Sequence, residues 1–281
     1  MSPLPGNFVA ILDVGHGNCC VVSDSGETSV IDTGLGTSLL EFLTEQGIAR
    51  LELVLLSHAD QDHISGLLQL LASKKVEIRR VRLNTDAAQQ SKLWKNLVYE
   101  LELQESQGVL NWEVQLTEGS GESFSVGRVN LDVIAPGKAL AALGPGNKTN
   151  DGRKITSNSV SAVIILQKSG TQIAVFPGDI DEVGLDDLQR RFPQKQFNAP
   201  VLVYPHHGGL SGSVSSEDFA SRICGVFAPS VVVFSIGRGM HGTPRPEVVA
   251  AVRKSVANVR IACTQLSEHC ALNVPTFDAN H

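Results

Sequence analysis

Short apolar runs alternate with polar, glycine-rich turns along the chain. In the first half these runs predict four buried or half-buried strands, at residues 8–12, 29–32, 51–57 and 76–84. Apolar residues at helical spacing predict three helices between and after them, at residues 37–47, 64–73 and 88–107. Gly47 is a suitable stop for the first of these helices.

The second half repeats the pattern. It predicts strands at residues 129–136, 161–167, 171–179, 199–205, 230–237, 259–265 and 270–275. Helices are predicted at 182–191 and 245–255, and the polar, glycine-rich segment 137–158 predicts a loop. Strands dominate and helices interleave, which is consistent with an α/β protein in which two mixed sheets pack face to face between helices. We therefore expect an αββα sandwich, with residues 1–281 forming a single domain.

Composition and cysteine usage bear on the cellular compartment of the protein. The 281 residues are 42% hydrophobic and 19% charged, and no apolar run reaches the ~18 residues of a membrane span. The start of the chain lacks the basic and apolar regions of a signal peptide. Five cysteines, with Cys19 and Cys20 adjacent, do not resemble a disulfide framework. We expect a cytoplasmic protein, in which Cys263 and Cys270 are small core residues rather than ligands of a structural zinc.

The segment "LSHADQDHISG" (56–66) places four potential metal ligands directly after an apolar strand. His58 and Asp60 alternate, so in an extended segment they face the same point, while Asp62 and His63 lie at the turn into a helix. Imidazole and carboxylate together suit zinc, manganese or iron(II). A solvated loop is the alternative, but four ligands in six positions favour a metal site.

Two other strands also end in potential ligands. "VFPGDID" ends in Asp179, and "VYPHHGG" ends in His206 and His207, either of which could be a ligand. Taken singly, these are an ordinary Gly-Asp turn and two solvent-facing histidines. Taken with the first segment, they supply enough ligands for two metal ions. Asp13 and Asp32 also follow apolar runs and are candidates to hold the histidine tautomers.

These motifs resemble the metallo-β-lactamase superfamily, in its His-x-Asp-x-Asp-His variant. More narrowly they are similar to the hydrolase domain of the ComEC group of competence DNA-uptake proteins. The matching motifs occur in the same order, as "LDVGHGN" (12–18), "IDTG" (31–34), "SHADQDHISG" (57–66), "NSVS" (158–161), "PGDI" (177–180), "PHHGG" (205–209) and "GTPRP" (242–246). The chain departs from that group at His16, Asn18 and Gly209, where the group has Gln, Asp and Ser. The superfamily's separate third-strand histidine has no counterpart, and the channel that accompanies the domain in competence proteins is not in this sequence.

The resemblance implies a hydrolase with a dinuclear centre of Zn²⁺ or Mn²⁺, in which a metal-activated hydroxide attacks a phosphodiester. The metal ligands would be His58, Asp60, Asp62, His63, Asp179, His206 and His207, with Asp179 bridging the two ions. The catalytic residues would be Asp62, Asp179, His207 and His241, with His241 or the histidine that is not a ligand protonating the leaving oxygen. The substrate would be held by Asn158, Ser211, Ser213 and Arg245. An ordinary polar turn is an equal reading for the two serines.

The substrate and partners stay open at this point. The leading prediction is a nuclease or phosphodiesterase acting on DNA or RNA. The net charge of −6 requires a local basic face for that purpose, and segments 74–82, 190–195 and 253–254 with Arg238 and Arg245 could supply one. A solvated surface is the other reading of those charges. The alternatives are a hydrolase of a small phosphoester or other small ester, and a non-catalytic metal-binding module of a bacterial defence complex. In each case a protein partner encoded nearby is possible, and no membrane is expected.

Overall fold

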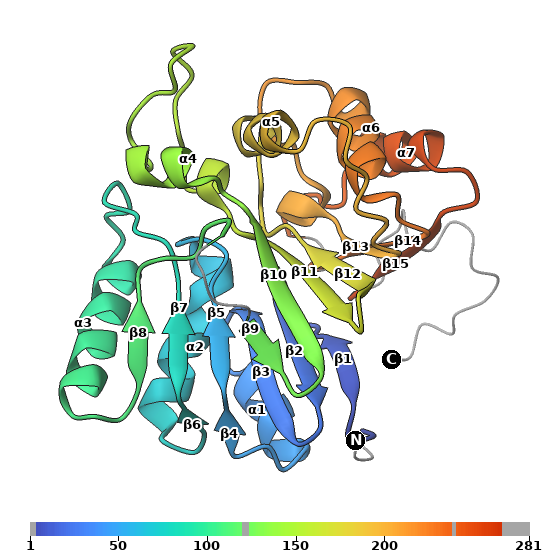
Figure 1. The fold of residues 1–281 in the computed structure, drawn as a ribbon. Coiled ribbons are helices and arrows are strands. Elements are labelled where there is room, and N and C mark those ends of the chain that lie inside the picture. The colour runs from blue at the N-terminus through green and yellow to red at the C-terminus, as the bar shows by residue number, and fades with distance from the viewer. Residues whose placement is uncertain (1–3, 120–123, 238–239, 266–281) are drawn as a thin grey trace.

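Two β-sheets pack face to face and carry helices on both outer sides (Figure 1). The structure is a computed structural model that describes residues 4–119, 124–237 and 240–265. The first sheet uses the first half of the chain and the second sheet uses the rest. The predicted αββα sandwich is therefore confirmed.

The first sheet has six strands in the order β1-β2-β3-β5-β7-β8. Their bounds are β1 (Phe8–Ile11), β2 (Cys19–Asp24), β3 (Glu27–Thr33), β5 (Leu53–Leu55), β7 (Arg80–Arg82) and β8 (Asn111–Glu113). Strands β1 to β3 run antiparallel and β3 to β8 run parallel. Two short strands, β4 (Arg50–Leu51) and β6 (Glu77–Ile78), pair separately.

The second sheet has seven strands in the order β15-β14-β13-β12-β11-β10-β9. Their bounds are β9 (Phe124–Val126), β10 (Val129–Ala135), β11 (Val163–Lys168), β12 (Thr171–Phe176), β13 (Val201–Val203), β14 (Val231–Phe234) and β15 (Arg260–Cys263). Strands β9 to β12 are antiparallel, and β12 to β15 are parallel. Parallel strands end at the same edge of a sheet, so β12 and β13 deliver their following loops to one place.

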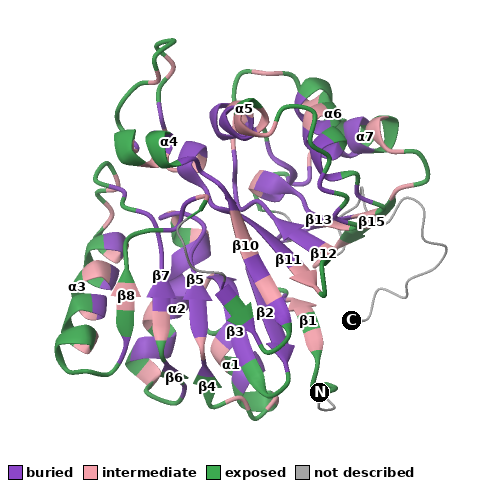
Figure 2. Cartoon of the chain, in the orientation of Figure 1, coloured by how far each residue is buried: buried purple, intermediate pink, exposed green. Residues whose placement is uncertain are grey.

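Three apolar layers hold the sandwich together. Cys20, Ile31 and Leu55 of the first sheet meet Leu131, Ile164 and Phe176 of the second in the middle layer. Helices α1 (Ser38–Glu45), α2 (Gln61–Ser73) and α3 (Lys92–Ser106) pack on the outer face of the first sheet. Helices α5 (Glu182–Arg191), α6 (Ser216–Phe227) and α7 (Pro246–Ser255) cover the second sheet. Figure 2 shows the buried positions concentrated along the strands and on the inner faces of these helices.

Several elements differ from the sequence prediction. The segment expected to be a loop contains helix α4 (Lys138–Leu143) and the 3₁₀ helix η1 (Asn158–Val160). Helix α6 was not predicted, and a further 3₁₀ helix, η2 (Pro205–Gly208), follows β13. Cys263 is disulfide-bonded rather than a free core thiol, which corrects that expectation, and Cys270 lies outside the described residues. No helix among the described residues is both long and apolar enough to span a membrane.

Ion pairs between Asp24 and two basic residues join the first sheet to the second. The carboxylate of Asp24, at the end of β2, accepts bonds from Arg128 Nε at 3.1 Å and from Lys168 Nζ at 2.7 Å. Arg128 lies between β9 and β10, and Lys168 ends β11, so both cations belong to the other sheet. Asp24 is 1% exposed. Its hydrogen bonds to Arg128 and Lys168 hold the pKa of this carboxyl well below its ordinary value.

We expect Asp24→Asn to lower the melting temperature by about 2–4 °C at pH 7. A carboxyl with a depressed pKa stabilises the folded state above its unfolded pKa of about 4, and this contribution is lost as pH falls. The difference in melting temperature between wild type and variant should therefore be largest near pH 7 and should become smaller below about pH 4. Thermal melts of both proteins from pH 3 to pH 8 measure it. A gap that does not change with pH would contradict an ionic role for Asp24.

Candidate metal centre

The corner between β5 and α2 presents the first group of potential ligands. His58 is 4% exposed and lies in the extended segment after β5, while Asp62 and His63 occupy the first turn of α2. Asp60 precedes the helix without capping it; its Oδ1 accepts from Gln89 Nε2 at 3.3 Å, and the residue lines the cleft. Gly66 lets α2 approach β3, because a Cβ there would lie 2.1 Å from the carbonyl oxygen of Thr33.

Asp32 orients the buried histidines from below. Its Oδ1 accepts the backbone N–H of Ser57 at 2.7 Å, and its Oδ2 accepts the Ser57 hydroxyl at 2.8 Å and His63 Nδ1 at 2.8 Å. With its own proton given to Asp32, Ser57 Oγ accepts from His58 Nδ1 at 3.0 Å. These bonds fix the Nδ1 proton of both imidazoles, so that Nε2 is the nitrogen left to bind a cation. The predicted tautomer-holding role suits Asp32, whereas the carboxylate of Asp13 bonds to Gly15 and Gln265 instead.

Asp179 comes from the loop after β12. Its backbone N–H donates to Ser161 Oγ at 3.0 Å, and its Oδ1 accepts the backbone N–H of His206 at 3.1 Å. Gly178, with φ of +53°, makes the turn that brings Asp179 under the cleft. A Cβ on Gly178 would lie 2.2 Å from Ser161 Oγ and 2.7 Å from Ser57 Cβ, so the turn accepts glycine alone without displacement of these neighbours.

The adjacent histidines after β13 have different environments. His207 is 1% exposed, and its Nδ1 donates to the carbonyl oxygen of Ser235 at 2.8 Å, which leaves Nε2 as a lone pair. His207 Nε2 lies 3.0 Å from Asp62 Oδ2 and 3.5 Å from Asp179 Oδ2. The side chain of His206 is 38% exposed, and its Nδ1 lies 3.1 Å from Asn158 Nδ2 and 3.6 Å from Asp179 Oδ2. Both residues have φ above +50°, which turns the two side chains in different directions.

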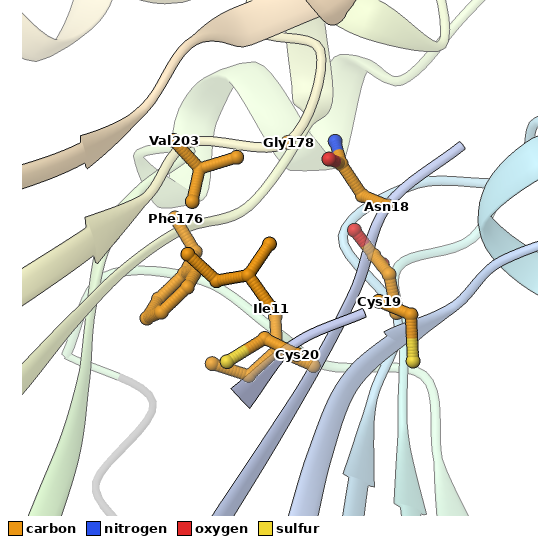
Figure 3. Close-up of a pocket in the computed structure, with 9 residues that line it drawn as sticks. Ile11, Asn18, Cys19, Cys20, Phe176, Gly178 and Val203 are labelled. Atoms are coloured by element: carbon orange, nitrogen blue, oxygen red, sulfur yellow. The ribbon is translucent and has the colours of Figure 1, made fainter. Parts of the chain in front are cut away.

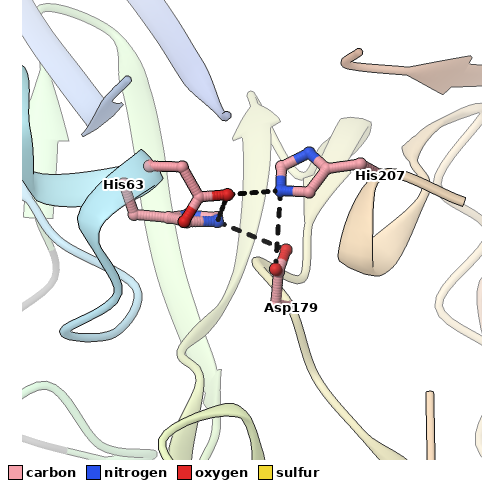
Figure 4. Close-up of side chains that lie close together, drawn as sticks. His63, Asp179 and His207 are labelled. Carbon is pink, nitrogen blue, oxygen red and sulfur yellow. Dashed lines mark ion pairs between the residues drawn. The ribbon is translucent and has the colours of Figure 1, made fainter. Parts of the chain in front are cut away.

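Four of these side chains converge on one point. Asp62, His63, Asp179 and His207 offer ligand atoms that all lie within 4.8 Å of one another. Figure 4 shows His63, Asp179 and His207 turned toward each other from different elements. The Nε2 atoms of His63 and His207 are buried and have no hydrogen-bond partner. Two unpartnered imidazole nitrogens facing two carboxylates fit a divalent cation such as Zn²⁺ or Mn²⁺.

The charges within the cluster balance each other. Burial disfavours the charged forms of His63 and His207, but Asp179 and its neighbouring carboxylates outweigh it. They raise the pKa of His63 well above its ordinary value and that of His207 to about 9. The two histidines in turn hold the pKa of Asp179 well below its ordinary value despite its burial. A cation bound here would replace the protons on the histidines as the partner of the carboxylates.

The other predicted ligands form a sparser group beside this cluster. His58 Nε2 is buried without a partner and lies 3.6 Å from Asp60 Oδ2. The rings of His58 and His63 are 4.1 Å apart, so the two groups adjoin. Asn158, in the region where the third-strand histidine was missing, faces His206. The structure thus assembles one four-residue cluster and, next to it, a pair made of His58 and Asp60.

A cleft of about 560 Å³ opens above the cluster. Arg245 and His241 line it, as does His16, a residue that the sequence prediction did not include. The His16 ring packs 4.3 Å from that of His207 and 4.5 Å from that of His241, and its Nε2 lies 3.7 Å from Asp62 Oδ2. The signal for His16 was its place between two glycines after an apolar strand, at a position where the similar group has Gln.

The predicted substrate residues are divided by the structure. Arg245 lines the cleft, whereas Ser211 and Ser213 are not among its lining residues. The hydroxyl of Ser213 donates to Glu182 at 2.9 Å and so ties the loop before α6 to the start of α5. This bond fits an ordinary turn at Ser213, whereas the buried hydroxyl of Ser211 has no hydrogen-bond partner.

A second, closed cavity lies between the sheets below the centre (Figure 3). Ile11, Cys20 and Phe176 line it, together with Asn18, whose Oδ1 has no hydrogen-bond partner. Its volume of about 10 Å³ is enough for roughly one water molecule. Substrate binding therefore belongs to the open cleft.

Comparison with known proteins agrees with this geometry. Residues 12–137 match the family model described as the metallo-beta-lactamase superfamily. That segment contains His58, Asp60, Asp62 and His63 on the corner between β5 and α2. Over these residues the chain is similar in sequence to the metallo-β-lactamase superfamily.

Solved structures extend the similarity in fold to both sheets. The metallo-beta-lactamase fold protein YhfI from Bacillus subtilis has a TM-score of 0.54 at 10% identity, covering 92% of this chain and 95% of that one. Igni18, a metallo hydrolase from the archaeon Ignicoccus hospitalis, has a TM-score of 0.52 at 16% identity, covering 90% and 93%. At these identities the likeness concerns the fold.

A curated relative is similar in sequence. ComE operon protein 3 of Bacillus subtilis is 26% identical over 251 residues, which are 82% of this chain but 28% of the relative. The chain thus spans less than a third of that protein. The family-model match over residues 12–137 and the ligand cluster together support a metal-dependent hydrolase.

Proposed function

We propose that the protein is a phosphodiesterase that uses divalent cations, Zn²⁺ or Mn²⁺, and acts on a nucleic acid or a nucleotide-like diester. The observation that carries the proposal is a pair of carboxylates, the partly buried Asp62 and the buried Asp179, that cluster with His63 and His207 at the cleft. A carboxylate-rich centre suits hard cations that hold phosphoryl oxygens. The likeness of the motifs to the ComEC group supports the same substrate class.

The residues of the chain have separable tasks in this proposal. Asp62, His63, Asp179 and His207 would hold one cation, and His58 with Asp60 would contribute to a second that shares Asp179. Such cations supply Lewis acidity and lower the pKa of a coordinated water. Asp32 keeps the ligand nitrogen of His63 aimed into the cleft.

Two further side chains act on the substrate directly. Arg245 and His241 both line the cleft. In the proposal, Arg245 binds a non-bridging phosphoryl oxygen, on which charge grows in the transition state, and His241 gives a proton to the leaving oxygen.

The basic residues of the chain bear on the size of the substrate. Arg245 is the one Lys or Arg among the described residues that line the cleft, and Arg238 lies outside the described residues. Each of the other predicted basic segments has a residue paired with a carboxylate: Arg79–Glu52 at 3.1 Å, Arg191–Asp187 at 2.9 Å and Lys254–Glu217 at 2.6 Å. This favours a substrate held at one phosphate, such as a chain end or a small diester, over a polymer bound along an extended basic track.

Hydrolysis assays test the proposal. Bis(4-nitrophenyl) phosphate and end-labelled single- and double-stranded DNA and RNA should be incubated with the protein and Mn²⁺, Zn²⁺, Mg²⁺ or a chelator. We expect metal-dependent hydrolysis that falls at least about a thousandfold in Asp62→Asn. Asp218→Asn, at a half-exposed carboxylate on α6, is the matched control and should retain activity.

Other outcomes would assign other functions. Stoichiometric cation binding without hydrolysis of any phosphodiester would overturn the phosphodiesterase and leave a hydrolase of another small ester. Absence of cation binding would favour the non-catalytic module that works with a protein partner encoded nearby. Equal activity of Asp62→Asn and wild type would place the chemistry elsewhere.

A further inference from the structure

Apolar side chains from three separate loops line the same cleft as the metal ligands. Leu35 follows β3, Leu210 follows η2, and Met240 lies between β14 and α7. Leu210 is 48% exposed and Met240 is 47% exposed, while Leu35 is half-buried. Apolar surface left in water beside four charged ligands gains free energy when a ligand covers it.

Hydrogen-bonded loops hold each of these side chains in place. Beside Leu35, the carbonyl oxygen of Gly34 accepts the N–H of Gly66 at 3.0 Å. The backbone N–H of Met240 donates to the carbonyl oxygen of Gly237 at 3.0 Å.

Leu210 is held on both sides. The N–H of Gly209 donates to the carbonyl oxygen of His206 at 2.7 Å, and the carbonyl oxygen of Ser211 accepts the N–H of Glu182 at 3.0 Å. These backbone hydrogen bonds next to Leu35, Leu210 and Met240 lower the cost of ordering the residues when a ligand binds.

Polar side chains line the same cleft. The Arg245 side chain is 43% exposed, and its nearest carboxylate, that of Glu247, is 3.7 Å away. Its guanidinium is therefore available to an anion that also reaches Asp62, Asp179 and His207. An anionic group next to an apolar group is the ligand that such a cleft complements.

We propose that Leu35, Leu210 and Met240 form an apolar subsite that binds a flat apolar or aromatic group attached to the phosphate held by Arg245 and the metal centre. This inference rests on the proposed phosphodiesterase function and names its substrate class as an aryl- or base-bearing phosphoester. A flexible thioether and two branched aliphatic side chains adapt to flat rings of different shape. The subsite therefore selects for the presence of a ring rather than for its hydrogen-bonding edges.

Binding of two phosphonates tests the subsite without turnover, since their C–P bond is not an ester. The affinity of phenylphosphonate and of methylphosphonate for the Mn²⁺-loaded protein is measured by titration calorimetry. Covering on the order of 60 Å² of apolar surface corresponds to about tenfold tighter binding of the phenyl compound. In the variant Leu210→Ser/Met240→Ser this preference should fall to about twofold or less, while methylphosphonate affinity is unchanged. Leu143→Ser, at an exposed leucine on α4 that does not line this cleft, should keep the full preference.

Each outcome decides the inference. Equal binding of the two phosphonates by wild type, binding of neither, or a preference that survives the double variant would overturn the subsite. A tenfold preference in a protein that hydrolyses no phosphodiester would support the subsite and overturn the proposed function. Hydrolysis of phosphodiesters by a protein that binds the two phosphonates equally would support the proposed function and overturn the subsite. Circular dichroism and melting temperature establish that the variants are folded.

Discussion

His207→Ala should weaken divalent-cation binding by about a hundredfold or more, whereas His206→Ala should leave it within about threefold. His207 is buried, and its unpartnered Nε2 lies 3.0 Å from Asp62 Oδ2, while the His206 side chain is 38% exposed and faces Asn158. Removing His207 also leaves His63 as the one histidine of the four-residue cluster that offsets the charge of Asp62 and Asp179.

The two adjacent histidines make a matched pair for this measurement. Cation content of the purified variants and calorimetric titration with Zn²⁺ or Mn²⁺ give the affinities, and phosphodiester hydrolysis gives the catalytic effect. His63→Ala should behave like His207→Ala, because its Nε2 lies 3.3 Å from Asp179 Oδ1 in the same cluster. A larger loss of cation binding from His206→Ala than from His207→Ala would reverse the assignment of the ligand.

Gly178→Ala should lower the free energy of unfolding by about 3–5 kcal/mol and weaken cation binding at the same time. The backbone at Gly178 has φ of +53°, and an added Cβ would lie 2.2 Å from Ser161 Oγ. Relief of that overlap requires a shift of Asp179 away from His63 and His207, or of Ser57 away from Asp32. Urea unfolding and cation titration of the same preparation measure both effects.

Gly170→Ala separates the two causes of the stability loss expected for Gly178→Ala, which are the positive φ and the overlap of the added Cβ with neighbouring atoms. Gly170 lies in the turn between β11 and β12, has φ of +78°, and has no atom within 4 Å of an added Cβ. It therefore carries the backbone penalty alone, about 1–2 kcal/mol, and should leave cation affinity unchanged. Equal effects of the two glycine substitutions on stability and on cation affinity would show that the contacts of Gly178 with Ser57 and Ser161 are unimportant.

Local sequence was sufficient for elements whose pattern agrees with their environment. Helix α5 was predicted at residues 182–191 and has those bounds, since Asp181 caps it through Val183 and Gly184 and its apolar positions recur at helical spacing. Helix α4 was missed because glycines flank it, although "KALAAL" consists of strong helix formers. Helix α6 was missed because a Ser- and Gly-rich segment precedes it, although Ser215 caps it through the N–H of Asp218.

The segment expected as one strand at 51–57 is divided in the structure. Arg50–Leu51 pairs with β6, whereas Leu53–Leu55 joins the first sheet between β3 and β7. Every residue from Leu53 to Leu56 is fully buried, so the hydrophobic run was a sound signal of burial. The hydrophobic run does not indicate which strands it pairs with, because these lie elsewhere in the chain.

The amino-acid sequence shows which strands form and which chemical groups follow them. The apolar runs specify strands, and the residues that follow three of them are imidazoles and carboxylates, so an αββα sandwich with ligands at strand ends was predictable. The types of ligand, and the replacement of a histidine by Asp60, can be read directly from one segment. These properties are local, because they depend on residue type and spacing.

Which of these potential ligands lie close together depends on the tertiary structure. The selection of His207 over His206 depends on the left-handed backbone of η2 and on the carbonyl of Ser235, 28 residues away. Likewise, Leu35, Leu210 and Met240 share a cleft because three loops from both halves of the chain converge at one edge of the sandwich. Such contacts depend on strand order and side-chain direction, which arise from packing of the whole fold and leave no mark in the spacing of residues along the chain.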